Sequence, residues 1–196
     1  WLYAVKVLNK QGTGFVSDII EGLQWCIDNG VQVANMSFGT SSDVQSFHDA
    51  IAAAYNAGMV LVAAAGNSGP ADGTVLYPAK YPEVIAVSAT DKSDAVPYWS
   101  SRGPEVELAA PGVDIYSTYK GGGYATLSGT SMAAPHVTGA AALVIAGGIA
   151  DLNGNGLMND EVRSRLQSTA EDLGVAGRDD LYGYGLVDAE RAVGGP

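Results

Sequence analysis

The chain has 196 residues, of which 47% are hydrophobic and 16% are charged, so it has enough apolar material for one globular domain. Its formal net charge of −11 argues against nucleic-acid binding, because phosphate contacts need a basic surface. No secretory signal peptide and no continuous apolar run of about 18 residues is visible, so we expect no membrane partner. The single cysteine, Cys26, excludes an internal disulfide, and its apolar flanks predict a buried thiol.

Strand-like and helical patterns alternate along the chain, which predicts an α/β fold with a mostly parallel sheet. An apolar run at 3–8 predicts the first strand, and 17–29 has a helical spacing that ends at Gly30. The run 59–65 is apolar throughout, which is typical of a strand buried on both faces. The other expected strands are 31–36, 84–87 and 108–110, and the other expected helices are 43–57, 130–145, 161–170 and 188–193.

The start of the expected helix 130–145 is the most informative segment. Ser131 follows a glycine turn and falls in the first helical turn, where free N–H groups and the helix dipole favour developing negative charge. That position suits the nucleophile of an acyl transfer. A plain helix cap formed by Thr130 and Ser131 fits the same spacing, and spacing alone does not choose between the two.

Residues 129–137, which read GTSMAAPHV, resemble the active-site motif of the subtilisin-like serine proteases at nine consecutive positions. The resemblance implies that Ser131 is the nucleophile, that Met132 is an oxidisable neighbour, and that Pro135 and His136 are structural parts of the helix. Three further segments resemble the family in the same order: 98–104, 109–113 and 182–187. The resemblance therefore covers nearly the whole chain.

The fold implied by this resemblance is the subtilisin-like three-layer α/β fold with a mostly parallel central sheet. Residues 1–196 would be the C-terminal portion of a single catalytic domain, with its N-terminal strands missing from this chain. The absent part would place a central strand between 3–8 and 31–36. Both segments would then face a gap with unpaired N–H and C=O groups.

Residues 63–69 read AAAGNSG and place Asn67 just after a buried strand, where loops of parallel α/β sheets form active sites. By itself, Asn-Ser-Gly is most often a plain turn. The segment is similar to the one whose Asn side chain donates a hydrogen bond to the oxyanion in subtilisin-like proteases. The resemblance therefore implies that Asn67 and the Ser131 N–H form an oxyanion hole.

The segment from Asn35 to Thr40 resembles the family's substrate-pairing strand, which also forms one wall of the P1 pocket. The implied substrate-binding residues there are Ser37, Phe38, Gly39 and Thr40, and Phe38 stands where the family usually has an aliphatic residue. The opposite wall would be Ala64, Ala65 and Gly66, with Leu76 at the pocket floor. Because some relatives have Gly at the floor, Leu76 predicts a shorter pocket that prefers medium apolar P1 residues over large aromatics.

A serine needs a general base and a group that orients this base. His136 lies five positions after Ser131, about 140° around the helix, and cannot reach its oxygen. His48 lies on the polar side of the expected helix 43–57, where a solvated or capping role fits better. The family's Asp-Thr/Ser-Gly and His-Gly-Thr motifs are absent, so we expect the N-terminal remainder of the protease to supply the catalytic Asp and His.

Residues 151–161, DLNGNGLMNDE, have oxygen-bearing side chains at positions 1, 3 and 5 and glycine at position 6, like the first half of a calcium loop. Position 12 is valine, so an EF-hand is not expected. A shortened loop would use Asp151, Asn153, Asn155, the Leu157 carbonyl, and either Asp160 or Glu161. The alternative is an Asn-Gly turn that leads into a helix whose N-terminus the two acids favour.

The family's habitual use of calcium supports a structural Ca²⁺ at this loop. The resemblance also suggests a weaker cation site at four residues: the carbonyls of Ala79, Tyr81 and Val84, with Glu107.

The resemblance implies a secreted, extracellular serine endopeptidase that acts on polypeptides through an acyl-enzyme on Ser131. A propeptide or an inhibitor is a further partner that the family allows. Serine-carboxyl peptidases share the Gly-Thr-Ser core but use a Glu base and an oxyanion Asp, so Asn67 favours the subtilisin branch. The alternative outside enzymes is a calcium-stabilised pseudoprotease or inert fragment, because the base is absent.

Overall fold

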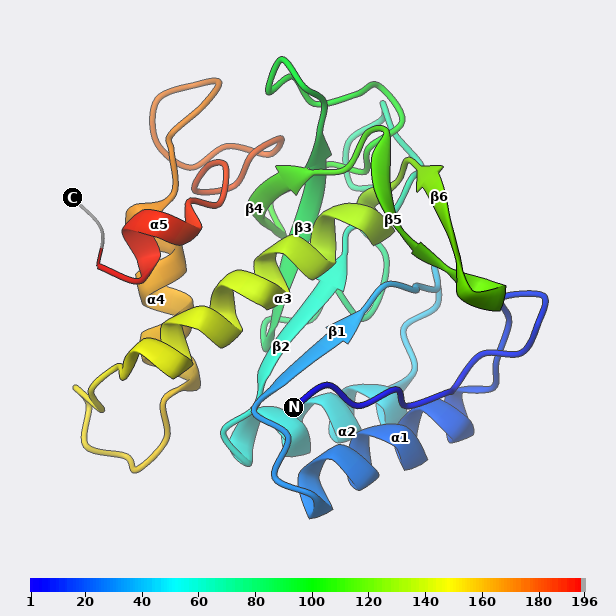
Figure 1. Ribbon diagram of the computed structural model, residues 1–196, viewed down its shortest axis with the longest axis vertical. Helices are drawn as coiled ribbons and strands as arrows, with labels where there is room; N and C mark the ends of the chain where they lie inside the picture. Colours follow the sequence, from blue (N-terminus) through cyan, green and yellow to red (C-terminus); the bar gives the residue numbers. More distant parts are fainter. Residues whose placement is uncertain (195–196) are drawn as a thin grey trace.

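The computed structural model describes residues 1–194 and contains a four-stranded parallel sheet in the order β1-β2-β3-β4, with helices on both faces (Figure 1). The strands of this sheet are β1 (Val33–Met36), β2 (Val60–Ala64), β3 (Val84–Thr90) and β4 (Val106–Pro111). The helices are α1 (Val16–Asp28), α2 (Gln45–Asn56), α3 (Thr130–Gly147), α4 (Asn159–Thr169) and α5 (Ala189–Ala192). The expected α/β class with a parallel sheet is confirmed, while the last two residues of the expected domain 1–196 lie outside the described residues.

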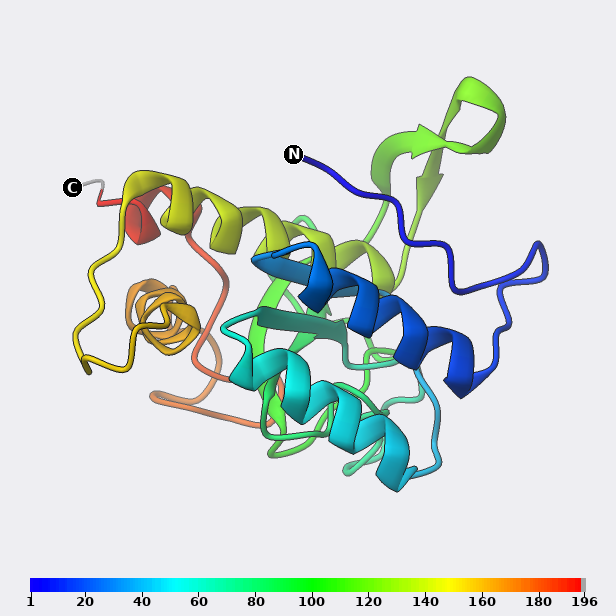
Figure 2. The ribbon, with the colours of Figure 1, turned by 90° about the horizontal axis from the view of Figure 1, so that it is seen from below.

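The centre of the sheet is apolar at every position. All five residues of β2 and all seven of β3 are buried, as the unbroken apolar run 59–65 predicted. Alternate side chains of β2 enter two separate cores. Leu61 and Ala63 pack with α1 and α2, whereas Val60, Val62 and Ala64 pack with α3 and α4. Figure 2 shows α2 and α3 on opposite sides of the sheet, which gives the three layers expected.

Helix α3 crosses the sheet and lies deep in the second core. By length and composition alone it would qualify as a membrane span, since its 18 residues have a mean hydropathy of 1.2. In the structure α3 is a core helix, because β2, β3 and β4 lie beneath it and α4 packs beside it. The face that meets them is made of small apolar residues, Ala133, Ala134, Val137, Ala140, Ala141 and Val144. These small side chains allow the helix to approach the sheet closely.

The predicted strand at residues 3–8 is wrong, because this segment forms no strand in the structure. A strand exists only with a ladder partner, and none of residues 1–194 pairs with it. The strand-like alternation has another use here: Val5 and Val7 cover Gly22 of α1, where an added Cβ would lie 3.1 and 2.7 Å from their Cγ1 atoms. The edge strand β1 pairs with β2 alone, consistent with the expected gap beside it.

An antiparallel hairpin that the sequence pattern did not predict, β5 (Ile115–Tyr119) and β6 (Gly123–Leu127), projects beside the start of α3 (Figure 1). Its residues are mostly exposed on both faces, so they lack the apolar alternation of a half-buried strand. Cross-strand stacking of Tyr116 on Tyr124, with ring centroids 5.4 Å apart, is the one strong pairing signal.

The connection from β2 to β3 is held down by Tyr81, which is 3% exposed. Its hydroxyl donates to Asp43 at 2.9 Å, and its ring stacks on His48 with centroids 4.1 Å apart. Burial, followed by the hydrogen bond to Asp43, raises the pKa of Tyr81 to about 12. A tyrosine in water has a pKa of about 10.

This raised pKa predicts a loss of stability in alkali. Below pH about 10 the phenol is protonated in both the folded and the unfolded chain, so its contribution is fully present. As pH rises from about 10 to about 12, only the unfolded chain releases this proton, and the free energy of unfolding should fall. Denaturant unfolding of an inactive Ser131→Ala protein across this range should show a shallower fall for Tyr81→Phe. The matched variant at exposed Tyr98 should keep the original slope, and equal slopes for both would contradict this assignment.

Candidate active site

Ser131 stands in the first turn of α3, directly beyond Gly129 and Thr130. Gly129 is the residue before the helix and has φ 157°, with an added Cβ only 3.5 Å from the Asn67 Nδ2. The Thr130 N–H donates to Asn67 and the Met132 N–H donates to the Gly129 carbonyl, whereas the Ser131 N–H has no partner among the described residues. A free N–H at the positive end of a helix is suited to bind an oxyanion.

Pro135 explains how α3 joins the end of β1. It has no N–H, so the carbonyl of Ser131, four residues earlier, lacks its helical partner. That carbonyl instead accepts a hydrogen bond from the Ser37 Oγ at 2.9 Å, and the Ser131 Oγ donates to the Ser37 carbonyl at 3.1 Å. Asn35 donates to the Ser37 Oγ at 3.0 Å and fixes its position. The nucleophile candidate is therefore clamped to the segment that was predicted to bind substrate.

The side chain of Asn67 has its carbonyl end fixed and its amino end free. Its Oδ1 accepts hydrogen bonds from the Thr130 N–H at 3.0 Å and the Thr130 hydroxyl at 3.1 Å. Thr130 in turn accepts from the Gly66 N–H at 3.1 Å. These donors assign the orientation of the amide, so Nδ2 must point away from them, and it has no partner among the described residues. Asn67 and Ser131 are thus brought together as predicted, and Thr130 is the positioning residue that sequence analysis missed.

Neither histidine contacts Ser131. The His136 Nδ1 is 2.9 Å from the Met132 carbonyl in its own helix, and the ring is exposed. His48 pairs with Glu83, with the Nε2 and Oε2 atoms 3.1 Å apart, and it is stacked on Tyr81 rather than solvated. Within residues 1–194, the Ser131 hydroxyl bonds only to the Ser37 carbonyl. Neither histidine ring is therefore bonded to the Ser131 hydroxyl in the described part of the chain.

The expected pocket floor, Leu76, lies between the two expected walls. A Cβ added to Gly39 would be 2.9 Å from the Leu76 Cβ, and one added to Gly66 would be 2.9 Å from the Leu76 Cγ. The backbone bridge between Thr40 and Tyr77 holds this arrangement, with N–H to carbonyl distances of 2.8 and 2.9 Å. Ala64 and Ala65 are buried on the other side, at 4% and 0% exposure. Gly39 and Gly66 are therefore required by close contact with Leu76.

The side chain of Phe38 departs from its expected role as a pocket wall. It is half-buried and packs against the first core, where it lines a hollow of about 70 Å³ together with Ile19 and Leu23 of α1. The backbone of Phe38 remains between Ser37 and Gly39. The backbone of Phe38 is therefore available at the site, while its ring packs on the α1 side of the sheet.

A cleft beside Ser131 was not foreseen from the sequence. It has a volume of about 360 Å³ and lies between the β5–β6 hairpin and the first two turns of α3. Its lining includes Tyr116, Leu127, Ser131, Met132 and His136. Leu127 and Tyr116 were passed over because no apolar periodicity surrounds them.

These features agree with comparisons to known proteins. The model of the subtilase family matches residues 1–185. The chain belongs to the subtilase family. It is 47% identical over 193 residues to subtilisin DY of Bacillus licheniformis, covering 97% of this chain and 67% of that protein. It is 43% identical over 186 residues to the minor extracellular protease Epr of Bacillus subtilis strain 168, covering 95% of this chain and 28% of Epr.

Solved structures of subtilases show the same fold. The structure named sphericase has a TM-score of 0.81 and 36% sequence identity, covering 93% of this chain and 66% of that one. The chain thus spans about two thirds of the length of subtilisin DY and of sphericase. The identification of the chain as part of a subtilase domain is confirmed.

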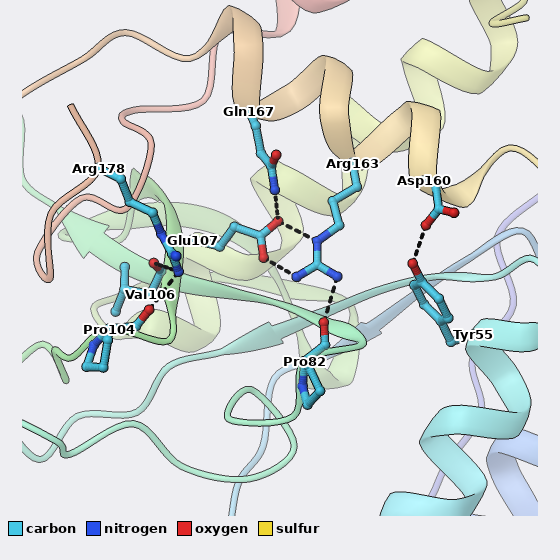
Figure 3. Close-up of polar contacts among 9 residues, drawn as sticks. All are labelled: Tyr55, Pro82, Pro104, Val106, Glu107, Asp160, Arg163, Gln167 and Arg178. Carbon is cyan, nitrogen blue, oxygen red and sulfur yellow. Dashed lines mark hydrogen bonds and ion pairs between the residues drawn. The ribbon is translucent and has the colours of Figure 1, made fainter. Parts of the chain in front are cut away.

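The structure places the expected loop ligands in two groups. The side-chain oxygens of Asp151, Asn153 and Asn155 accept hydrogen bonds from N–H groups of their own loop, and the carboxylate of Glu161 reaches the start of this loop. Asp160 instead accepts a hydrogen bond from Tyr55 of α2 (Figure 3). No cluster of three or more His, Cys, Asp or Glu side chains suited to a metal occurs among residues 1–194. The Leu157 side chain packs over Gly58, at the corner between α2 and β2.

At the second expected cation site, an arginine of the chain holds the acid. Arg163 donates to both carboxylate oxygens of Glu107, and Gln167 donates to one of them at 2.8 Å (Figure 3). The same guanidinium donates to the Pro82 carbonyl at 2.7 Å. Glu107 is 3% exposed, so this pair is desolvated. The Glu107 carboxylate of the expected cation site therefore has Arg163 as its counter-ion.

We expect Arg163→Ala to be strongly destabilising, because it leaves the charge of Glu107 buried without compensation. Breaking a buried pair in this way costs about 3–5 kcal/mol of unfolding free energy. Denaturant unfolding in the Ser131→Ala background measures this loss. Arg191→Ala is the matched control, because its pair with Asp188 is largely exposed, with side chains 56% and 29% accessible. That control should cost about 0–1 kcal/mol, and equal losses for both variants would contradict this account.

Proposed function

We propose that the complete protein is a secreted serine endopeptidase that hydrolyses peptide bonds through an acyl-enzyme on Ser131. One observation supports the proposal: Asn67 is held through its Oδ1 by Thr130, the residue before Ser131, and both the Asn67 Nδ2 and the Ser131 N–H are free among the described residues. Two unpaired donors next to a nucleophile are the arrangement that an oxyanion hole needs. Membership of the subtilase family supports the reaction class.

The reaction would begin with attack of the Ser131 Oγ on the peptide carbonyl carbon, while the hydroxyl proton passes to a base. The negative oxygen that forms would be bound by Asn67 Nδ2–H and Ser131 N–H, and the dipole of α3 would favour this charge. The amine leaves with a proton from the base, and water then hydrolyses the ester on Ser131. In the described chain the hydroxyl donates to the Ser37 carbonyl, so activation requires it to exchange this acceptor for the base.

The base and its orienting carboxylate would come from an N-terminal portion of the same protease. The unpaired edge of β1 supports this, because an added strand would complete the sheet next to Ser37. An extended polypeptide substrate would pair with the backbone of residues 37–40, and a propeptide or inhibitor would use the same edge. The cleft of about 360 Å³ under the hairpin would receive residues on the leaving-group side.

An extracellular location is part of the proposal, and its support is the name of the relative Epr, an extracellular protease of Bacillus subtilis. The chain is acidic, with a net charge of −11. Its single cysteine is buried and free, which fits a chain that needs no disulfide. The alternative, an inactive fragment or pseudoprotease, makes the opposite prediction about the reactivity of Ser131.

Reaction with a fluorophosphonate probe tests this function in the complete protein. Rapid labelling that maps to Ser131 is the expected result, because the probe needs an activated serine and an oxyanion hole. Asn67→Ala should reduce kcat for a peptide substrate by about 10²–10³ with little change in KM, which is the loss known for this donor in subtilisin itself.

Two controls complete this test. Ser131→Ala should abolish labelling, and Asn29→Ala, which removes an exposed amide at the end of α1, should leave kcat unchanged. Absence of labelling in a folded, complete protein would establish the inactive alternative instead.

The position of Leu76 predicts substrate preference. Since Leu76 occupies the space between Gly39 and Gly66, the complete enzyme should cleave after Leu about tenfold better than after Phe, in terms of kcat/KM. Leu76→Gly should open this space and reverse the preference. Because the measurement is a ratio for two matched peptides, a loss of folded enzyme cancels. A strong Phe preference in the parent enzyme, or an unchanged ratio in the variant, would overturn the assignment.

A further inference from the structure

The connection between α3 and α4 folds its oxygen-bearing side chains inward. The Asp151 carboxylate accepts from the N–H groups of Gly154 and Gly156, both at 2.8 Å. Asn153 accepts from the Asn155 N–H at 2.9 Å, and Asn155 accepts from the Leu157 N–H at 2.7 Å. Such contacts also occur in ordinary turns, so they show only on which side these oxygens lie.

The first turn of α4 provides two adjacent acids that behave differently. Asp160 points toward α2, where it accepts the hydroxyl of Tyr55 (Figure 3). Glu161 points back to the loop, and its Oε1 accepts from the N–H groups of Leu152 and Asn153, both at 3.2 Å. Of the two acids that the sequence left open, Glu161 is therefore the one that closes the loop.

The other oxygen of Glu161 has no partner. The residue is 7% exposed, and its Oε2 is buried without a hydrogen bond from any of residues 1–194. Leaving a buried acceptor unpaired is unfavourable, and more so when the group is charged. The N-terminus of α4 offsets only part of this cost and gives Oε2 no donor. A capping role accounts for Oε1 and leaves Oε2 unexplained.

Glu107 and Glu161 differ in the side chains that compensate their charges. Both glutamates are buried, but Glu107 has Arg163 and Gln167 on its two oxygens. Arg163, two residues after Glu161, is held by Glu107, and Arg165 donates from its Nε to the Ala192 carbonyl at 2.9 Å. No Lys, Arg or His forms an ion pair with Glu161 among the described residues. A cation bound from outside the described residues would compensate this carboxylate.

We propose that this loop binds one Ca²⁺ ion, with Glu161 as the carboxylate that closes the site and Asp160 excluded from it. The other ligands are the oxygens of Asp151, Asn153 and Asn155 and the carbonyl of Leu157. Two carboxylates balance the charge of a divalent ion, while amide and carbonyl oxygens complete a set made only of oxygen. Ca²⁺ prefers such flexible all-oxygen sites, whereas softer metals take nitrogen or sulfur.

The site would hold the α3–α4 connection against α2. Asn159, the first residue of α4, donates to the Tyr55 carbonyl at 3.0 Å, and the Leu157 side chain packs on Gly58. Ca²⁺ bound here would make opening of this corner less frequent, in proportion to its free concentration over the dissociation constant. The site lies apart from the Ser131 cleft and shares no lining residue with it.

Amide hydrogen exchange with and without CaCl₂ tests this proposal in the complete protein carrying Ser131→Ala, which prevents autolysis. At free Ca²⁺ about ten times the dissociation constant, exchange of residues 151–158 should slow about tenfold. Glu161→Gln should lose this protection. Asp160→Asn removes the same charge one residue earlier and should keep it.

The readout is local, so calcium bound elsewhere in the protein does not affect the conclusion, and no catalytic activity is required. Absence of calcium-dependent protection in the loop of the parent protein, or undiminished protection in Glu161→Gln, would overturn the proposal. If Glu161→Gln does not fold, Asn153→Ala decides, because that side chain is exposed. It should need about tenfold more Ca²⁺ for the same protection, and an unchanged requirement would overturn the site.

Discussion

The open first turn of α3 is the constraint on which the active site depends. A helix leaves its first N–H groups without internal partners, and here each has a different use. Thr130 uses its N–H to orient Asn67, Met132 bonds the Gly129 carbonyl, and Ser131 keeps its own N–H free. Pro135 opens the same turn on its carbonyl side, so that Ser37 can bond the main chain of Ser131. Ser131, Asn67 and the segment that begins at Ser37 are thereby joined through one helical turn.

The sheet makes this turn rigid. α3 lies on β2, β3 and β4 through alanines and valines, and the buried strands beneath it leave no room for the helix to tilt. The loops that carry Asn67 and Ser37 leave the carboxyl ends of neighbouring parallel strands, β2 and β1. Their side chains therefore meet at one edge of the sheet, which is where ligands bind in open α/β folds. Leu76 and the two glycines in close contact with it occupy the same edge.

Away from the Ser131 site, two buried glutamates, Glu107 and Glu161, differ in how their charges are compensated. Glu107 is matched by a guanidinium in fork geometry, so this pair needs no ion. Glu161 has hydrogen bonds on one oxygen only. A buried acid without a cation is costly, and the contacts of Glu161 with the loop and with the N-terminus of α4 leave its Oε2 without a partner. That contrast, rather than the number of acids in the loop, is what supports a bound divalent ion.

Several elements were determined by the sequence itself, because their signals lie within short windows. Helical spacing gave α1 and α2 to within two residues, and the unbroken apolar run gave β2. The GTSMAAPHV string and the Asn67 segment carried the family and the two site residues. Each of these signals is local: a period, a cap, or a motif that must stay intact for the chemistry.

Only the tertiary structure decided the rest, because those outcomes depend on partners far away in the chain. Residues 3–8 alternate like a strand, yet a strand needs a neighbour, and α1 is the neighbour they have. The ring of Phe38 packs on the α1 side of the sheet. Glu107, which was expected at a cation site, pairs with Arg163. The choice between Asp160 and Glu161 rested on Tyr55, which lies about a hundred residues earlier. A sequence pattern specifies which atoms are available, and only packing specifies which of them meet.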